Sequence, residues 1–135
     1  MKIIIETVPH TSQRYNTIGD WQWDGDTLQI KVSEMGDWRR EFLVGIHELI
    51  ETILCKQDGV TEEEVDKFDL SHPEIHEPGD EPDCPYSQQH NLAMLIETLL
   101  MFKLSVNQKE YEDKMEHLQT IWDLNERKDK KEKSR

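Results

Sequence analysis

The chain has 135 residues, and its 29 acidic and 16 basic side chains give a formal net charge of −13 at pH 7. That length is typical of one domain, and an acidic surplus repels the phosphate backbone, which disfavours nucleic acid as a direct partner. Neither a signal peptide nor a membrane span of roughly 18 apolar residues is found, so we expect a cytoplasmic protein without a membrane segment.

The first part of the chain is predicted to form a small antiparallel sheet. Residues 2–7 are rich in β-branched side chains, which favour a strand. Apolar and polar residues then alternate over positions 18–36 on both sides of the sequence DGD, and this pattern indicates a hairpin. Gly25 can supply the positive φ that the turn requires.

Two long helices are predicted after the sheet. Residues 37–57 carry apolar side chains at helical spacing, with Asp37 placed as the N-cap and Gly59 as the end signal. Residues 87–104, for which Ser87 is the candidate N-cap, are apolar around most of the helix circumference. Both helices are therefore predicted to be buried. The apolar arc of the first helix consists of Trp38, Phe42, Ile46, Leu49, Ile50 and Ile53.

The remaining segments complete a single α+β domain over residues 1–125. We expect a short acidic helix after the N-cap candidate Thr61, and a long loop over residues 70–86, where four of the five prolines lie. An amphipathic helix over residues 108–125 carries an apolar stripe that could join two copies of the chain. The charged residues 126–135 are predicted to form a disordered tail. The expected architecture is a small antiparallel sheet packed on a mostly helical body.

Each long helix carries a histidine and a carboxylate among apolar residues. His47 and Glu51 are one turn apart in GIHELIETILC, so an imidazole and a carboxylate can converge on one point. His90 and Glu97 share one face of the second helix, where a carboxylate among apolar neighbours needs a cation or a hydrogen-bond network. If the two helices pack side by side, these residues form a divalent-metal site, with Glu97 as the fourth ligand or as a partner of a ligand. Two imidazoles with carboxylates suit zinc, and iron, manganese or magnesium are alternatives.

The sequence HELIE resembles the metal-binding helix of the zincin metallopeptidases, whose pattern is His-Glu-x-x-His. The resemblance implies that His47 is the first zinc ligand and that Glu48 is the general base that activates a water molecule. The second histidine of the pattern is replaced by Glu51, so His90 or Glu97 would complete the ligand set. The sheet ahead of the helix also resembles the zincin arrangement, in which an edge strand holds an extended substrate. A metal-dependent hydrolase of amides or esters is the implied activity.

The chain also resembles small uncharacterised proteins of bacteriophages and bacteria, over most of its length up to residue 104. The shared sequences are SEMGDWR, HELIE, VDKFD, EPGD and PYSQQH. This resemblance implies a protein of phage or prophage type, and it supports the choice of residues rather than a particular reaction.

Three alternatives remain open. The ion could be structural and hold the two helices together. The acidic surface could itself be the active feature, in a protein-interaction or inhibitor module that needs no metal. Finally, Glu48-x-x-Glu51 followed by Glu63-x-x-Asp66 resembles the paired acidic motifs of the all-α nucleoside-triphosphate pyrophosphohydrolases, which would imply magnesium and a nucleotide. The substrate or protein partner is not specified by any of these patterns.

A few residues are weaker candidates. The spacing of His72 and His76 occurs in zinc sites, but Pro73 argues against a regular helix between them. Cys55 and Cys84 form no CxxC motif, so we expect free thiols. Four further acids could assist a metal ion, and are otherwise expected to be solvated: Asp66, Asp69, Glu77 and Asp80.

Overall fold

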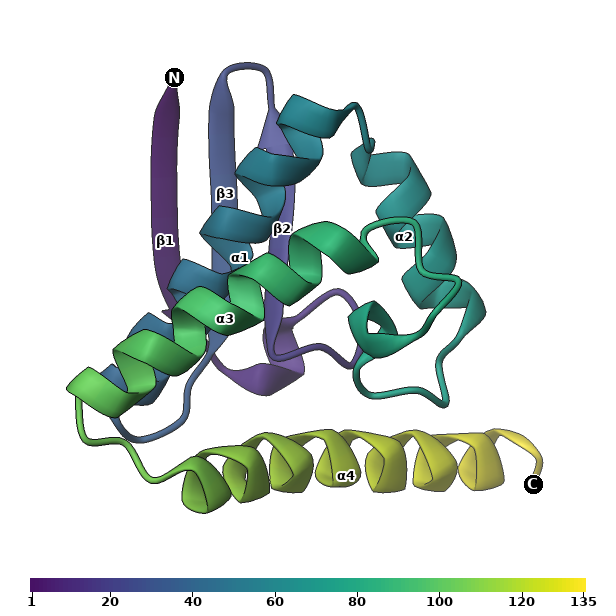
Figure 1. Ribbon diagram of the computed structural model, residues 1–135. Helices are drawn as coiled ribbons and strands as arrows, with labels where there is room; N and C mark the ends of the chain where they lie inside the picture. Colours follow the sequence, from purple (N-terminus) through teal and green to yellow (C-terminus); the bar gives the residue numbers. More distant parts are fainter.

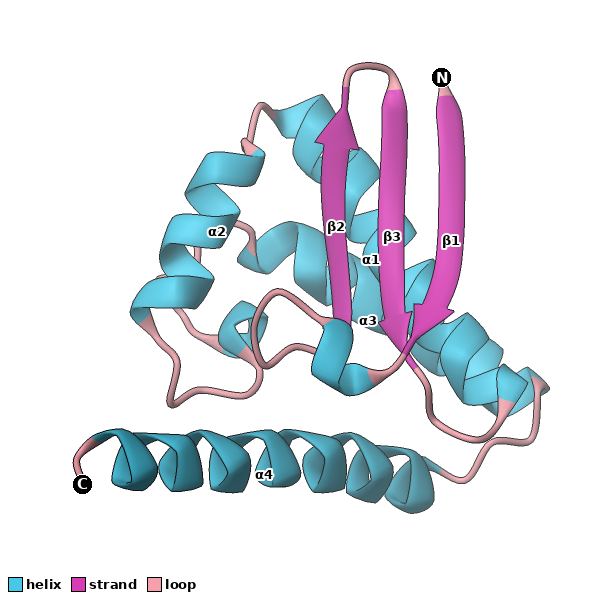
Figure 2. Ribbon diagram, turned by 180° about the vertical axis from the view of Figure 1, so that it is seen from behind, coloured by secondary structure: helices cyan, strands magenta, loops and turns pink.

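A small sheet at the N-terminus carries four helices in the computed structural model, which describes residues 1–135 (Figure 1). This architecture confirms the predicted α+β class. The helices are α1 (Trp38–Asp58), α2 (Glu62–Ser71), α3 (Ser87–Lys103) and α4 (Gln108–Lys133). α1 packs on one face of the sheet and α3 packs on α1, whereas the opposite face of the sheet has no helix over it (Figure 2). None of the helices has a stretch long and apolar enough to cross a bilayer.

The two strands of the predicted hairpin are the central strand and one edge strand of the sheet. Strands β2 (Gly19–Asp24) and β3 (Thr27–Ser33) pair antiparallel, and Gly25 takes a φ of 58° in the turn between them. Alternate side chains of β3 are fully buried against α1, because successive residues of a strand point to opposite faces. These side chains belong to Leu28, Ile30 and Val32.

The first strand does not follow the predicted antiparallel arrangement. β1 (Lys2–Val8) pairs parallel with β3, and the strand order is β1-β3-β2. The connection after β1, which includes a short 3-10 helix at His10–Ser12, carries the chain past the end of β3 before β2 begins. β3 has the most apolar alternation of the three strands, so burial is greatest when β3 occupies the centre. The sheet is therefore mixed, and β1 is an edge strand.

Helix α1 has the predicted ends but a different buried face. The Asp37 side chain accepts a hydrogen bond from the backbone N–H of Arg39, and Gly59 ends the helix with a φ of 75°. The predicted apolar arc is only partly covered, since Trp38 and Phe42 are 69% and 43% exposed. The buried stripe runs instead through Leu43, Val44, His47, Glu51 and Cys55. His47 and Glu51 therefore lie within the buried stripe of α1.

Helix α3 also differs from the prediction that it is mostly buried. It packs on α1 along one side only, and Leu95, Leu99 and Phe102 on its other side are 58%, 66% and 88% exposed. Its N-cap is Tyr86, which makes no capping side-chain bond, and Ser87 is the first helical residue. The apolar circumference of α3 therefore exceeds what the rest of the domain covers.

The remaining two helices lie beside the sheet and below it (Figure 1). α2 is capped by Thr61 as predicted, and it lies beside β2, where Glu62 accepts a hydrogen bond of 2.6 Å from the backbone N–H of Trp23. α4 runs across the end of the sheet and continues to Lys133, so the charged segment for which the sequence predicted a disordered tail is drawn as helix up to that residue (Figure 1). Acidic residues four positions before lysines support that last part of the helix, and lysines in its last turn complement the helix dipole.

Candidate metal centre

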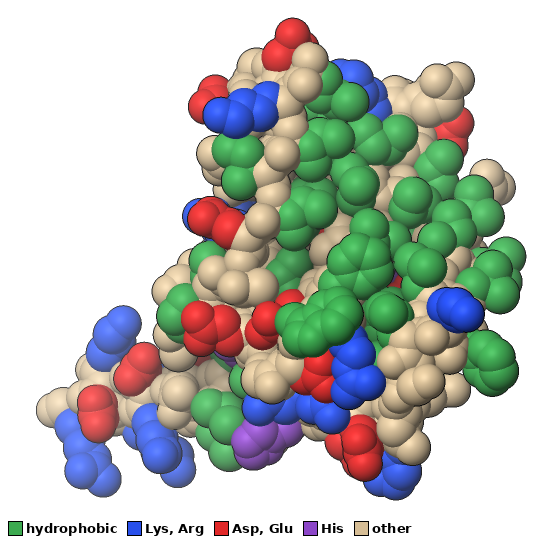
Figure 3. All heavy atoms as spheres, turned by 90° about the vertical axis from the view of Figure 1, so that its left-hand side faces the viewer, with side chains coloured by type: hydrophobic (Ala, Val, Ile, Leu, Met, Phe, Trp, Pro, Cys, Tyr) green, Lys and Arg blue, Asp and Glu red, His purple; other side chains and the backbone are tan.

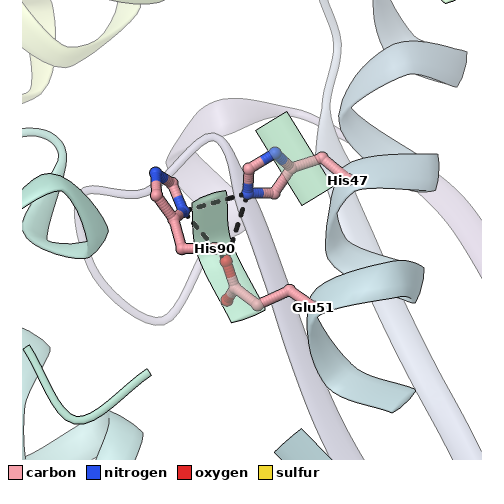
Figure 4. Close-up of side chains that lie close together, drawn as sticks. All are labelled: His47, Glu51 and His90. Carbon is pink, nitrogen blue, oxygen red and sulfur yellow. Dashed lines mark hydrogen bonds and ion pairs between the residues drawn. The ribbon is translucent and has the colours of Figure 1, made fainter. Parts of the chain in front are cut away.

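Three side-chain atoms from α1 and α3 converge on one point. His47 Nε2 lies 3.1 Å from Glu51 Oε2 and 3.2 Å from His90 Nδ1, and His90 Nδ1 lies 3.0 Å from Glu51 Oε2 (Figure 4). A tetrahedral zinc ion with ligands at about 2.0 Å separates its ligand atoms by about 3.3 Å. Two nitrogens and one oxygen at these separations form a buried group that could hold a metal ion.

This group is buried because α3 packs along α1. His47, Glu51 and His90 are 7%, 5% and 4% exposed. Burial opposes ionisation of Glu51, but the two imidazoles outweigh that effect and hold the pKa of the carboxyl below its ordinary range. Burial likewise lowers the pKa of His47, whereas the carboxylates of Glu51 and Glu97 outweigh burial and raise it to about 11. A metal ion must displace that proton, so metal affinity for this group should rise with pH.

The outer nitrogen of each imidazole faces a further carboxylate. His90 Nε2 lies 2.9 Å from Asp80 Oδ1, while its Nδ1 is one of the three converging atoms. His47 Nδ1 lies 3.2 Å from Glu97 Oε1, although the angle is too bent for a hydrogen bond. When the imidazole loses one of its two protons to a metal ion, a carboxylate on the outer nitrogen keeps the remaining proton there, and the inner nitrogen can bind the metal. Glu97 thus lies behind His47, outside the three-atom group.

Two glycines make room for side chains of the centre. A Cβ on Gly79 would lie 2.5 Å from Cγ and Nδ1 of His90, and a Cβ on Gly19 would lie 2.6 Å from Cγ of Glu48. Gly79 belongs to the short 3-10 helix Pro78–Asp80, which also carries Asp80, so one short segment presses on His90 and hydrogen-bonds to it. The glycines of EPGD and IGDW therefore allow the backbone to pack closely against His90 and Glu48.

Glu48 lies in the wall of the same cleft, next to the start of β2. Its carboxylate accepts no hydrogen bond from the protein and forms no ion pair, and it packs against the backbone at Gly19. Burial and the nearby carboxylate of Glu51 raise the pKa of Glu48 well above its ordinary range, with His47 acting in the opposite direction. A carboxylate with a raised pKa and no protein partner can accept a proton from a ligand in the cleft.

The centre opens into a cleft of about 420 Å³. β2, α1, α3, α4 and the loop before α3 contribute its walls, so residues far apart in the sequence meet there. No lysine or arginine lines the cleft. The carboxylates that line it belong to Asp20, Glu48, Glu51, Asp69, Glu77, Asp80, Glu97, Glu112 and Glu116. The electrostatic potential inside should therefore favour cations.

Asp69 forms a polar cluster with two tyrosines in the cleft wall. The hydroxyls of Tyr15 and Tyr86 donate hydrogen bonds to its two carboxylate oxygens at 2.8 and 2.5 Å. Burial has the largest effect on the pKa of Asp69 and raises it from about 3.8 to about 6, although these hydrogen bonds act in the opposite direction. Because the folded state binds this proton more tightly than the unfolded state, Asp69 favours folding at low pH, and this contribution is lost as pH rises through about 6.

Because Asp69 titrates near pH 6, the free energy of unfolding should depend on pH in this range. Between about pH 5 and about pH 7 the free energy of unfolding should fall by about 1 kcal/mol more in the wild type than in Asp69→Asn. Urea unfolding of both proteins at the two pH values measures the difference. Equal pH dependence in the two proteins would show that Asp69 does not titrate in this range.

Several residues considered from the sequence lie away from the centre. His72 Nδ1 bonds to the backbone oxygen of Phe68, and His76 Nε2 contacts Asp123, so these two histidines face different partners. Asp66 pairs with Arg14. Both cysteines are buried free thiols, as expected. Asp66, in the second half of the paired acidic motif, therefore faces Arg14 and does not join Glu48 and Glu51 at the centre.

No family model, curated protein or solved structure matches the chain. The resemblances to the zincins, to the phage and bacterial proteins and to the pyrophosphohydrolases therefore stay predictions.

Proposed function

We propose that the protein is a zinc-dependent hydrolase of the zincin-like, phage or prophage type. The observation that carries the proposal is the convergence of His47 Nε2, Glu51 Oε2 and His90 Nδ1 within 3.0–3.2 Å of one another. Three protein ligands of nitrogen and oxygen type, with a side open to a cleft, are typical of catalytic zinc, whereas structural zinc usually has four protein ligands.

The residues around the three ligands have distinct roles in this proposal. Asp80 and Glu97 orient the imidazoles of His90 and His47 by facing their outer nitrogens. Glu48 accepts a proton from the attacking water molecule and returns it to the leaving group, since its carboxylate is in the cleft and has no protein partner. Bound zinc would act as a Lewis acid on the water or on the substrate carbonyl.

The lining of the cleft restricts the substrate. Carboxylates surround the centre without a lysine or arginine among them, so a neutral or positively charged amide or ester fits better than an anion. A nucleoside triphosphate would meet repulsion along the whole cleft, which disfavours the pyrophosphohydrolase alternative. The free edge of β2 is a poor site for an extended substrate, because α2 lies beside it and Glu62 occupies the N–H of Trp23.

The test combines elemental analysis with substitution of Glu48. We expect the purified full chain to contain one zinc ion, and Glu48→Gln to keep that ion while hydrolysis of a library of cationic fluorogenic peptides falls by about 100-fold or more. A metal-free protein would overturn the proposal. Full activity in Glu48→Gln would contradict the role of Glu48 as the base.

A structural ion is the second candidate, because the three ligands connect α1 to α3. It predicts that chelation lowers the melting temperature and that no hydrolysis is found in the metal-loaded protein. The peptide library therefore separates the two candidates, since both predict metal binding.

A further inference from the structure

The outer edge of β1 is an unprotected strand edge. β1 pairs with β3 on one side only, and it contains neither a proline nor a bulge within Lys2–Val8. Natural monomers usually protect such an edge with prolines, bulges, several charges or a covering helix, because free N–H and C=O groups attract another strand. No element covers this side of β1, which lies at the border of the molecule in both ribbon views (Figures 1 and 2).

The backbone hydrogen bonds show which groups are free on this edge. The N–H of Lys2 bonds to Asp26 and the C=O of Val8 bonds to Glu34, so the even-numbered residues of β1 direct their backbone groups toward β3. In a strand the direction alternates, and Ile3, Ile5 and Thr7 therefore direct theirs to the open edge.

A large apolar surface adjoins this edge. Figure 3 shows hydrophobic side chains gathered over this side of the molecule, from β1 toward the helices. Ile3 and Ile5 are 40% and 44% exposed on the face of β1 that carries the helices, where Ile5 contacts Gly45 of α1. The adjacent helices expose further apolar residues, among them Trp38, Phe42, Leu95, Leu99 and Phe102. An apolar surface of this kind is typical of an interface.

We propose that two copies of the chain associate through antiparallel pairing of their β1 strands, with Ile4 on the two-fold axis. In this register Ile3 of one copy lies opposite Ile5 of the other, and both direct their backbone groups to the open edge, so they can exchange two hydrogen bonds. Lys2 then lies opposite Glu6 of the second copy, on the face of the sheet that has no helices. Two antiparallel copies of the sequence KIIIE can thus pair opposite charges and also form backbone hydrogen bonds with each other.

This register places the helices of both copies on the same face of a six-stranded sheet. Trp38 and Phe42 at the start of α1, both exposed in the single chain, would come close to the second copy and lose contact with water. The edge itself carries one lysine and one glutamate, so it is neutral in a chain whose net charge is −13. A second copy therefore fits this edge better than a strongly basic partner, which would be drawn to the acidic cleft.

The register is tested by exchanging the two charges. Lys2→Glu and Glu6→Lys each place like charges opposite one another twice in the dimer, and each should raise the dimer dissociation constant by about tenfold or more. The double variant Lys2→Glu/Glu6→Lys restores both pairs and should restore the wild-type constant. If only the net charge mattered, Glu6→Lys would strengthen the dimer, because it makes the chain less acidic.

Sedimentation velocity of the full chain from roughly 1 to 100 μM gives these constants, and circular dichroism confirms that each variant is folded. Ile3→Pro is a second probe, since it removes an N–H of the open edge and no bond to β3. A monomer throughout the concentration range, a dimer that persists in Ile3→Pro, or a charge exchange that fails to restore association would overturn the proposal.

Discussion

Replacement of His47 by alanine is expected to abolish stoichiometric metal binding. His47 provides one of only three atoms in the converging group, and two remaining ligands do not hold a divalent ion at ordinary concentrations. Loss of an outer partner alone typically lowers metal affinity about 10–100-fold, so loss of a ligand should lower it by more than about 100-fold. Elemental analysis after dialysis, together with titration of the stripped protein with zinc, measures this effect.

The matched control is His117→Ala, which removes the same side chain from an exposed position on α4. This variant should bind one ion with the affinity of the wild type. Thermal unfolding should separate the two proteins further, because only a protein that binds zinc is stabilised by it: about 4 kcal/mol at a thousandfold excess over the dissociation constant. Unchanged metal content in His47→Ala would place the ion elsewhere and refute the assigned centre.

Gly79→Ala, which adds one methyl group in the loop before α3, is expected to lower zinc affinity strongly. The new Cβ would lie 2.5 Å from Cγ and Nδ1 of His90, which is far closer than side-chain contacts allow. The ring is held by α3 and cannot bend away like a long chain, so either His90 turns or the 3-10 helix withdraws with Asp80. Zinc affinity should fall by about 10–100-fold or more, as when an outer partner is lost.

Gly19→Ala provides the control for this substitution. Its Cβ would also lie under 3 Å from a side chain of the cleft, but that side chain is the flexible end of Glu48, which can move at low cost. We expect this variant to keep its zinc and to lose hydrolytic activity instead. Neither glycine has a positive φ, so alanine strains the backbone at neither position. Equal zinc affinity in Gly79→Ala and the wild type would show that His90 is not positioned by this contact.

Local sequence signals predict much of the fold and part of the centre. Asp37 and Gly59 delimit α1 because capping and a left-handed terminus depend on a few neighbouring residues. The four-residue spacing of His47 and Glu51 puts them on one helix face, and side-by-side packing of the two apolar helices is the condition under which His90 joins them. These features need only helix periodicity, and the structure brings the three side chains together.

Sequence reasoning places Asp80 only among the weaker candidates and does not predict its partner, because that contact depends on how distant segments pack. Asp80 lies in an irregular loop, and its bond to His90 follows from how that loop folds over α3, for which no periodicity exists. The parallel pairing of β1 depends on which strand takes the centre of the sheet. The exposure of Leu99 and Phe102 on α3 could not be predicted either, because an apolar helix face indicates burial but does not say by what.

The position of β1 also has a consequence for the order of folding. β1 precedes the other strands of the sheet, yet its only partner within the chain is β3, which lies beyond the hairpin turn. A hairpin closes locally in about 1–10 μs, whereas a parallel partner must be found across a longer loop at a greater entropic cost. During synthesis β1 therefore stays unpaired until the β2–β3 hairpin has formed and β3 can pair with it.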